Sequence, residues 1–403
     1  MSSNIGKLDR YIYIIICLFA FTSCINNVIA NNILAIGVLI GIIRCYKERL
    51  SIKIYKGYIQ AILIFFGFIF ISIFVSPDIL KSSKEFWRYF NRMFAFLLIL
   101  FFAREKKQIL TVFFTFLLSM FINNLYAAYK GTFFIYNGVQ NMRITGFENG
   151  IIIFAGHLLI MLPILFILIF NKQIKNKGYL KYILLAFIIS FIALLENGTR
   201  IAWLAMGIIL PLIFILKVQN LKKILFTGCI SLLFVGIFVY MSPFLQTRLY
   251  SFIDYKNTSN QGHYMIARDS IELIKDNPIM GVGLGRYKEV FNEEYRSEEH
   301  FRLEDGFTPH AHNNTLTLWA ETGIFGCMTF WYMYLSFLYY SFRRWLKEKN
   351  DSDLMFFMIT LATVLQGITD YSFGLNQVVK IYFCMLAIYL NYQIYEKQVE
   401  TIK

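Results

Sequence analysis

Apolar stretches long enough to cross a membrane recur along almost the whole chain. A transmembrane helix needs about 20 mostly apolar residues, because the hydrocarbon core is roughly 30 Å thick and a helix rises about 1.5 Å per residue. The pattern predicts an all-α, polytopic integral membrane protein with about 12 transmembrane helices. The stretches centre on residues 11–25, 28–43, 57–75, 86–102, 109–129, 151–170, 179–195, 201–216, 224–240, 324–342, 354–369 and 378–394.

Composition and charge agree with this class. Of the 403 residues, 57% are hydrophobic and only 16% are charged, which lies far from the balance of a soluble domain. The formal net charge is +14, but the lysines and arginines concentrate in connections on one side of the predicted helices. Short loops rich in these residues stay in the cytoplasm, so we expect both termini there and the first stretch to be a retained helix rather than a signal peptide. Topology explains the basic charge, and no nucleic acid is expected as a partner.

The longest hydrophilic stretch, residues 241–311, lies on the opposite, extracytoplasmic side between the ninth and tenth predicted helices. Within it, Tyr264–Lys275 has helical periodicity, with an apolar side and a charged side. The GVGLGRY segment that follows has three closely spaced glycines. Arg286 stands where the last glycine of a dinucleotide-binding fingerprint should be, and no alternation of strand and helix surrounds it. We therefore predict one large loop that contains short helices and a tight turn.

The segment TPHAHNNTLTLWAETGIFG follows this loop directly. Thr308 is suited to cap a helix and Pro309 to begin one, so we predict an interfacial helix over residues 310–322, ended by the next glycine. From residue type alone, His310 and His312 have three interpretations: polar caps at the membrane boundary, catalytic groups, or a metal-binding H-x-H pair. No cysteine or carboxylate cluster adjoins them, which argues against the metal.

Three segments resemble the O-antigen ligase and polymerase superfamily in pattern and order. They are ENGTRIAWLAMG, RDSIELIKDNPIMGVGLGRY and HAHNNTLTLWAETGIFG, and together they span Glu196–Gly326. The resemblance implies a glycosyltransferase at the periplasmic face of the bacterial inner membrane, among membrane lipids. Its donor would be a glycan linked to polyprenyl (undecaprenyl) diphosphate, and its acceptor the lipid A-core oligosaccharide of lipopolysaccharide. The resemblance implies no metal and no other cofactor.

The same resemblance assigns roles to individual residues. His312 matches the family's catalytic histidine and would act as general base, because its ordinary pKa lies near working pH; His310 would support it. Arg200 and Arg268 match the arginines expected to bind the diphosphate, since a guanidinium holds phosphate oxygens in pairs. Each has a simpler interpretation: Arg200 can extend toward the interface from a helix end, and Arg268 can pair with Glu272 on one helix.

Further residues are candidates for the same site. Arg143 lies on the outer side before the sixth predicted helix and could join the phosphate site. Asp370, at the outer end of the eleventh, could orient the base or a sugar, although a helix cap is the simpler interpretation. Asn313, which follows His312 in the motif, is a supporting candidate.

A basic stripe comes from the residues themselves. Lys81, Lys84, Arg88 and Arg92 are spaced 3, 4 and 4 apart, so one helix would present them on a single face. The predicted topology places them outside, against the usual bias. Such a stripe indicates an anionic partner, either the donor diphosphate or the phosphates of the acceptor; headgroup contact is the alternative.

Several functions share these features. A polymerase of the same superfamily carries the same motifs, and a protein O-oligosaccharyltransferase is a further relative. The single dominant loop favours the ligase. A 12-span transporter is the alternative from another class, but it would more often show two similar halves and charged residues at mid-membrane. Here the polar residues gather outside.

Overall fold

The computed structural model describes residues 2–47, 55–136, 143–148, 150–218, 242–303 and 308–402, with isolated positions between 220 and 240. Within these residues the chain forms helices and no strands. The helices are α1 (Ser2–Thr22), α2 (Asn27–Lys47), α3 (Lys56–Ser72), α4 (Ile79–Phe90), α5 (Met93–Phe102), α6 (Lys106–Tyr136), α7 (Ile151–Ile169), α8 (Lys172–Asn176), α9 (Leu180–Asn197), α10 (Arg200–Val218), α12 (Pro243–Ile253), α13 (Thr258–Asp276), α14 (Tyr287–Val290), α15 (Glu298–Leu303), α16 (Asn314–Glu348), α17 (Asp351–Gln366) and α18 (Asn376–Ile402). Single turns form η1 (Ile73–Val75), η2 (Phe291–Tyr295) and η3 (Ser372–Gly374).

Seven of the described helices are long and apolar enough to cross a membrane. They coincide with the second, third, fifth, sixth, seventh, eighth and twelfth predicted spans. The tenth and eleventh spans correspond to the second part of α16 and to α17, and the first to α1. The ninth, residues 224–240, lies mostly outside the described residues. The all-α, polytopic class is confirmed, and the number of about 12 spans stays a prediction.

The fourth predicted span is two helices, and the break divides the basic stripe. Lys81, Lys84 and Arg88 lie on α4, whereas Arg92 falls in the turn between α4 and α5 and is 0% exposed. The prediction that one helix face presents all four was therefore wrong. The physical reason is that the Arg92 guanidinium donates hydrogen bonds to the carbonyls of Phe373 and Gly374 instead of facing solvent.

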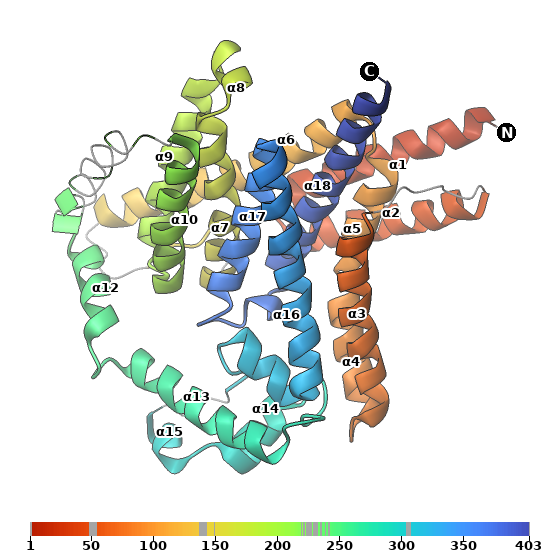
Figure 1. Cartoon of the computed structure of the whole chain (residues 1–403). Helices are drawn as coiled ribbons and strands as arrows, with labels where there is room; N and C mark the ends of the chain where they lie inside the picture. Colours follow the sequence, from red (N-terminus) through yellow and green to blue (C-terminus); the bar gives the residue numbers. More distant parts are fainter. Residues whose placement is uncertain are drawn as a thin grey trace.

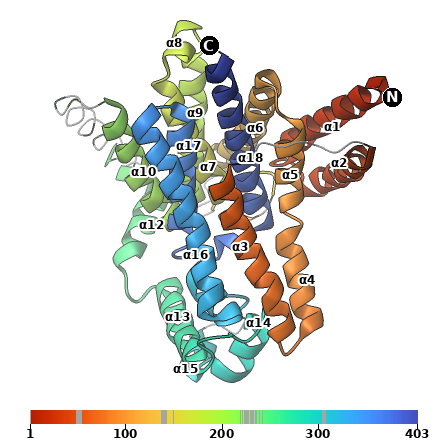
Figure 2. The same cartoon turned by 45° about the vertical axis from the view of Figure 1, so that its right-hand side comes forward.

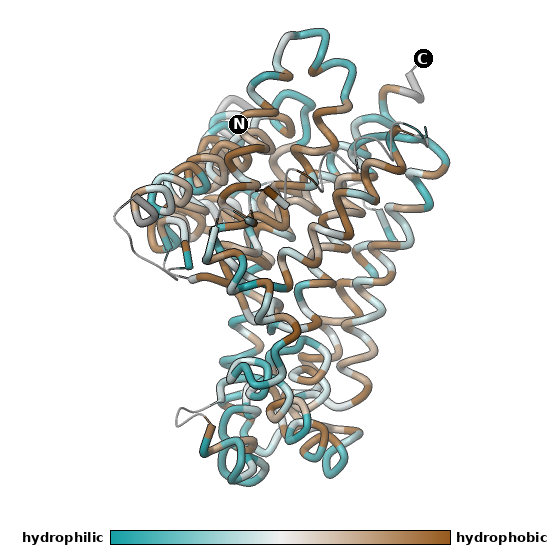
Figure 3. The backbone as a smooth tube through the Cα atoms, turned by 90° about the vertical axis from the view of Figure 1, so that its left-hand side faces the viewer, coloured by the Kyte–Doolittle hydropathy of each residue, from teal (hydrophilic) through white to brown (hydrophobic). Residues whose placement is uncertain are grey.

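The chain separates into an apolar bundle and a hydrophilic lobe formed by α13, α14 and α15. Figure 1 shows the lobe at one end of the bundle, with α8 and the C-terminus at the other end. In Figure 3 the middle of the bundle is mainly hydrophobic, and hydrophilic segments gather at the two ends. Among the described residues, the lysine-rich α8 and the C-terminal end of α18 therefore lie at the end opposite the lobe.

Helix α16 joins the bundle to the lobe. It packs along α3 on one side and α17 on another, and its first turns also contact α13 (Figure 2). The helix kinks at Gly323, where φ is 70°. A Cβ atom there would lie 1.8 Å from the carbonyl oxygen of Ile279, so only glycine allows both the conformation and the close approach of the lobe.

The helix that carries the motif begins later than predicted. It starts at Asn314, with the Asn313 side chain accepting a hydrogen bond from Leu316 N at 2.9 Å. Residues 310–322 are therefore not one helix, and His312, with φ at 49°, lies just before it. Asparagine and threonine both cap helices well. Here Asn313, which is nearer the apolar run than Thr308, is the cap. The end of the helical segment at Gly323 was predicted correctly.

The GVGLGRY segment is a tight turn, as predicted. Gly281, Gly283 and Gly285 all have positive φ, at 67°, 103° and 76°. The turn docks on the kinked part of α16 through backbone hydrogen bonds from Val282 N to Ala320 O at 2.8 Å and from Gly283 N to Glu321 O at 3.0 Å. These bonds hold the lobe against the segment that carries the histidines.

Candidate active site

Three histidines gather where α13 meets the start of α16. The ring centroids of His310 and His312 are 4.4 Å apart, and those of His263 and His312 are 5.0 Å apart. His312 N donates to Nδ1 of His310 at 3.3 Å, so a neutral His310 carries its proton on Nε2. All three side chains are half-buried. No local sequence signal marks His263, because its place beside His312 depends on how α13 docks.

The two asparagines of the motif fix the connection between α17 and α18 beside the histidines. Asn313 caps α16 and also donates from Nδ2 to Ile368 O at 2.7 Å. Asn314 donates to Ser372 Oγ at 3.0 Å and accepts from Phe373 N at 3.0 Å. One end of each amide acts as a donor and the other as an acceptor, which Ala or Asp cannot reproduce. The pair therefore acts through positioning.

In this connection, Tyr371 contacts one of the histidines on one side and α4 on the other. The rings of Tyr371 and His310 are 5.2 Å apart, and the Tyr371 hydroxyl hydrogen-bonds to that of Tyr89 on α4. Arg88, exposed on the same helix, pairs with Glu85, and its charge acts on His310. The buried Arg92 stabilises the connection by donating hydrogen bonds to the carbonyl oxygens of Phe373 and Gly374. The structure thus places Arg88 near the histidines and gives Arg92 a positioning contact.

Both histidines of the motif are unprotonated at neutral pH. Burial lowers the pKa of His310 to about 4, with the charge of Arg88 acting in the same direction. Burial also lowers the pKa of His312 to about 3, helped by His310 and His263. A neutral imidazole can accept a proton. In the described part of the chain, no group of three or more His, Cys, Asp or Glu has an arrangement suited to a metal ion.

Three arginines converge on the turn between α9 and α10. Arg143 donates to Asn197 O at 3.2 Å and to Thr199 Oγ1 at 2.8 Å, and Arg248 on α12 donates twice to Gly198 O, at 3.1 and 2.9 Å. Arg200, the first residue of α10, donates to Ser251 O at 2.8 Å. None of the three forms an ion pair with a carboxylate among the described residues.

The charges of the arginines shift one another's pKa and the pKa of one buried carboxyl group, that of Asp370. Burial and the neighbouring Arg248 lower the pKa of Arg143 to about 10, and Asp370 opposes that shift. Asp370 is 7% exposed, and its Oδ2 has no hydrogen-bond partner in the described structure. Burial raises its pKa to about 7, against the charges of Arg143 and Arg200. Three half-buried guanidiniums with one half-ionised carboxyl form a positively charged cluster suited to a polyanion. Arg248 was missed in the sequence, because nothing in its local pattern marks it.

Two short links join the arginine cluster to the histidine cluster. Asp370 faces the arginines, and the next residue, Tyr371, contacts His310. On α13, Asn260 accepts a hydrogen bond from Arg200, and His263, which is three residues further on, contacts His312. Residues three apart on a helix are neighbours on its surface. The two clusters are therefore linked through α13 and through the connection between α17 and α18.

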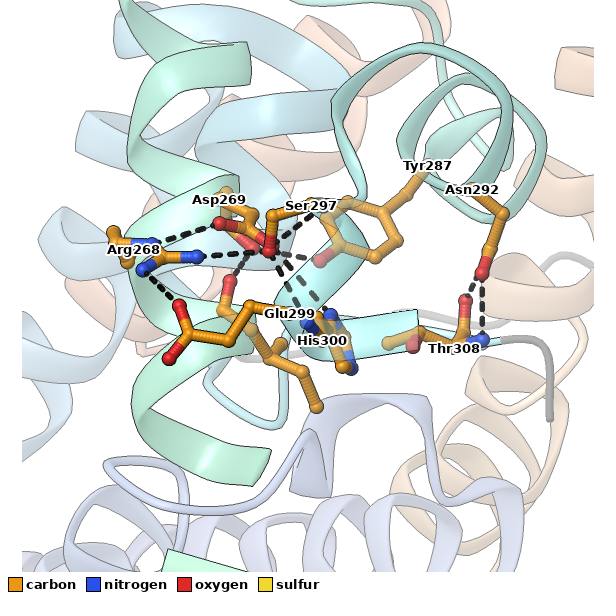
Figure 4. Close-up of polar contacts among 10 residues, drawn as sticks. Arg268, Asp269, Tyr287, Asn292, Ser297, Glu299, His300 and Thr308 are labelled. Carbon is orange, nitrogen blue, oxygen red and sulfur yellow. Dashed lines mark hydrogen bonds and ion pairs between the residues drawn. The ribbon is translucent and has the colours of Figure 1, made fainter. Parts of the chain in front are cut away.

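Arg268 lies apart from these clusters, in a contact network within the lobe (Figure 4). Its guanidinium donates to Asp269 Oδ1 at 3.0 Å, Glu299 Oε2 at 3.0 Å and Ser297 Oγ at 2.8 Å. Asp269 also accepts from Ser297 N at 3.1 Å and faces His300. The pairing with Glu272 is not found; that carboxylate pairs with Lys275 instead. Each of the three guanidinium nitrogens of Arg268 donates to an acceptor of the chain itself, and these bonds join α13 to α15.

Glu321 anchors the lobe on the other side. It is buried on the first part of α16, and burial together with Glu85 raises its pKa to about 8, while backbone hydrogen bonds from Gly285 and Tyr287 lower it. The carboxyl group is therefore largely protonated at pH 7. Its hydrogen bonds from the backbone of Gly285 and Tyr287 hold the end of the glycine turn against α16.

Fold and site define a polytopic helical membrane protein whose polar chemistry gathers at the lobe end of its bundle. Residues 185–331 match the family model described as O-antigen ligase, which confirms the resemblance to the O-antigen ligase superfamily. Proteins of this family are glycosyltransferase-like membrane enzymes with O-antigen ligase or polymerase roles. No curated protein matches the chain. The matched segment holds all three histidines, Arg200 and Arg248, whereas Arg143 and Asp370 lie outside it.

Proposed function

We propose that the chain transfers a glycan from a polyprenyl diphosphate carrier to an acceptor hydroxyl group. The observation that carries this proposal is the cluster of Arg143, Arg200 and Arg248 beside unprotonated histidines. A lipid diphosphate leaving group gains negative charge as its bond to the sugar breaks, and fixed guanidiniums stabilise that charge. No described carboxylate neutralises these three arginines by an ion pair, so their charge is available to a ligand.

In the proposed reaction, the acceptor oxygen attacks the anomeric carbon of the donor sugar. The bond from that carbon to the diphosphate oxygen breaks, and the diphosphate leaves with the electron pair. The acceptor's proton passes to His312, with His310 and His263 around it. A pKa of about 3 for His312 is low for a base, but a bound diphosphate adds negative charge nearby and raises it. The two clusters have complementary tasks in one transfer.

We propose lipid A-core oligosaccharide as the acceptor, which makes the chain an O-antigen ligase. One large hydrophilic lobe beside the site supports this choice, as it gives a single broad surface for a core oligosaccharide. A polymerase, which joins one lipid-linked repeat to another, and a protein O-oligosaccharyltransferase are the alternatives within the family. They differ in acceptor and not in the donor chemistry described above.

The orientation belongs to the same proposal: lobe in the periplasm, both termini in the cytoplasm, bundle in the inner membrane. Lysine-rich connections at the end opposite the lobe support it. Reporter fusions check it, with Asn257 expected outside and Lys175 and Lys347 expected inside. A cytoplasmic signal from Asn257 would place the site in the compartment without the acceptor and would end the proposal.

The direct test is transfer by purified protein. Lipid diphosphate-linked glycan and lipid A-core are mixed with the enzyme in chelator, and the glycosylated lipid is separated by gel electrophoresis. We expect transfer without added metal. Replacing the core acceptor by a second lipid-linked repeat distinguishes a polymerase, and an acceptor peptide distinguishes the protein-modifying alternative. Activity lost in chelator and restored by zinc would convert the histidine cluster into a metal site. No transfer to any acceptor, with uptake of substrate into vesicles, would favour a transporter.

A further inference from the structure

We propose that a cavity at the end of the bundle opposite the lobe binds one anionic phospholipid. The cavity has a volume of about 720 Å³ and is lined by α6, α7, α17 and α18, with α8 at its edge. It is separate from the histidine and arginine clusters. The proposal does not rest on the transfer reaction.

The inner wall of the cavity is apolar. It is lined, among others, by Leu110, Phe113 and Phe114 of α6, Leu168 of α7, Met355 of α17 and Ile388 of α18. Lys106 stands at the first turn of α6, eight residues before Phe114, which corresponds to about 12 Å along the helix. That depth fits a glycerol backbone and the upper part of its acyl chains. The apolar wall therefore continues inward from a polar mouth.

The mouth of the cavity carries an excess of positive charge. Lys106, Lys172, Lys177, Lys217 and Lys349 line the cavity, against the carboxylates of Asp351 and Glu396. Both carboxylates already interact with other groups. Asp351 pairs with Lys217 and accepts a hydrogen bond from Asn171 Nδ2 at 2.6 Å. The carboxylate of Glu396 interacts electrostatically with the positive charge of Lys106. Among the described residues, Lys172, Lys177 and Lys349 form no ion pair with a carboxylate.

Only one kind of occupant satisfies both parts of the cavity. A small soluble anion would pair with the lysines but leave the apolar wall without a partner. A zwitterionic lipid would cover the wall but add no net negative charge at the mouth. An anionic phospholipid pairs its headgroup phosphate with the lysines and packs its chains on the wall. Its position at a lysine-rich membrane boundary is where such lipids are available.

The test is native mass spectrometry of the full-length protein in detergent, titrated with phosphatidylglycerol and, separately, with phosphatidylcholine of the same chains. We expect one tightly bound phosphatidylglycerol and much weaker binding of phosphatidylcholine. The Lys172→Gln/Lys177→Gln variant should bind phosphatidylglycerol about thirtyfold more weakly, which is about fivefold for each lysine. The matched control is Lys175→Gln/Lys181→Gln, which removes the same charge at the same end from exposed residues outside the cavity. Its affinity should be unchanged.

A second variant tests the apolar wall without touching the charge. Leu110→Trp fills the cavity beside Lys106 and should remove the tight site while the lysines remain. Three results overturn the proposal: equal weakening by both lysine pairs, which indicates diffuse surface charge; equal affinity for phosphatidylcholine; or no effect of the tryptophan. Displacement of the lipid by an equal concentration of glycerol 3-phosphate would also overturn it, because the mouth alone would then bind.

Discussion

Two groups of arginines in this protein have opposite surroundings. Arg268 in the lobe donates to Asp269, Glu299 and Ser297, so its charge is balanced within the chain. Arg143 and Arg248 donate to neutral backbone and hydroxyl oxygens, and the carboxyl group whose charge acts on Arg143 is Asp370, whose own pKa is raised to about 7. An arginine on the outer side is therefore not evidence of a phosphate site by itself. The charge of its acceptors decides whether it is available to a ligand, and we infer that Arg268 mainly orders the lobe.

The largest expected effect comes from the histidine between these regions. His312→Ala should lower the rate of transfer at saturating donor by about 10²- to 10⁴-fold, because it removes the proton acceptor. Donor affinity should change little, since the arginines remain. The measurement is the initial rate with purified protein and lipid substrates. His300→Ala is the control, because that histidine lies in the Arg268 network. Near-normal turnover by the His312 variant would leave it as a polar group before a helix.

The next largest effect is expected from Arg143→Lys and Arg248→Lys, which should weaken donor binding. Lysine keeps the charge but cannot donate two parallel hydrogen bonds to phosphate oxygens. Loss of one charge-assisted hydrogen bond weakens binding by about 10- to 100-fold. Donor binding is measured with the purified protein and the lipid diphosphate, at equal protein levels. Full donor affinity in both lysine variants would remove the phosphate role and with it the contrast between the two regions.

Arg268→Lys should have a smaller effect, on stability. It disrupts a partly exposed network between α13 and α15, so we expect a loss of about 1 kcal/mol and a fall of about 2 °C in the apparent Tm. The rate per folded molecule and the affinity for the donor should stay close to wild type. Thermal unfolding in detergent and donor binding are measured on the same preparation. Weakened donor binding with an unchanged Tm would make Arg268 a ligand and not a structural residue.

The last effect is a pH dependence of donor affinity set by Asp370. Its pKa is raised to about 7, so the group is neutral below this pH and becomes negative as the pH rises through it. The negative form competes with the diphosphate for the arginines, and donor affinity should fall by up to about tenfold between pH 6 and pH 8. Asp370→Asn should flatten this profile. The pKa of His312 lies near 3, so no loss of kcat/KM from its protonation is expected above pH 5. A pH profile that is unchanged in the Asn variant would exclude Asp370 as its source.

The sequence predicted the parts of the fold that depend on local pattern. Apolar stretches located the helices, and the glycines of GVGLGRY marked a turn, because positive φ is a property of single residues. The sequence did not show that the helix starts at Asn314, since Thr308 and Asn313 are both suitable caps and tertiary contacts select between them. It also did not show the break before Arg92, which depends on carbonyl groups almost three hundred residues further on.

For the candidate site too, the sequence identified the residues that a local pattern marks and missed those that tertiary contacts bring in. His310, His312, Arg200 and Asp370 were selected because a motif or a helix end marked them. His263 and Arg248 were not, because each joins the site through the docking of α13 or α12 and carries no local signal. For Arg268 the sequence offered a partner on its own helix, whereas the actual partners are Asp269, next in sequence, and Glu299, which lies on another helix.

The close approach of Ile279 to Gly323 has a consequence for exchanging parts between related enzymes. The lobe and the kinked part of α16 form one fitted surface, with carbonyl oxygen against glycine and two backbone hydrogen bonds beside it. A chimera that replaces residues 258–303 alone would place the glycine turn of one enzyme against the α16 kink of another. Acceptor specificity should therefore transfer only when the lobe and residues 308–326 move together, which defines the smallest portable unit for engineering.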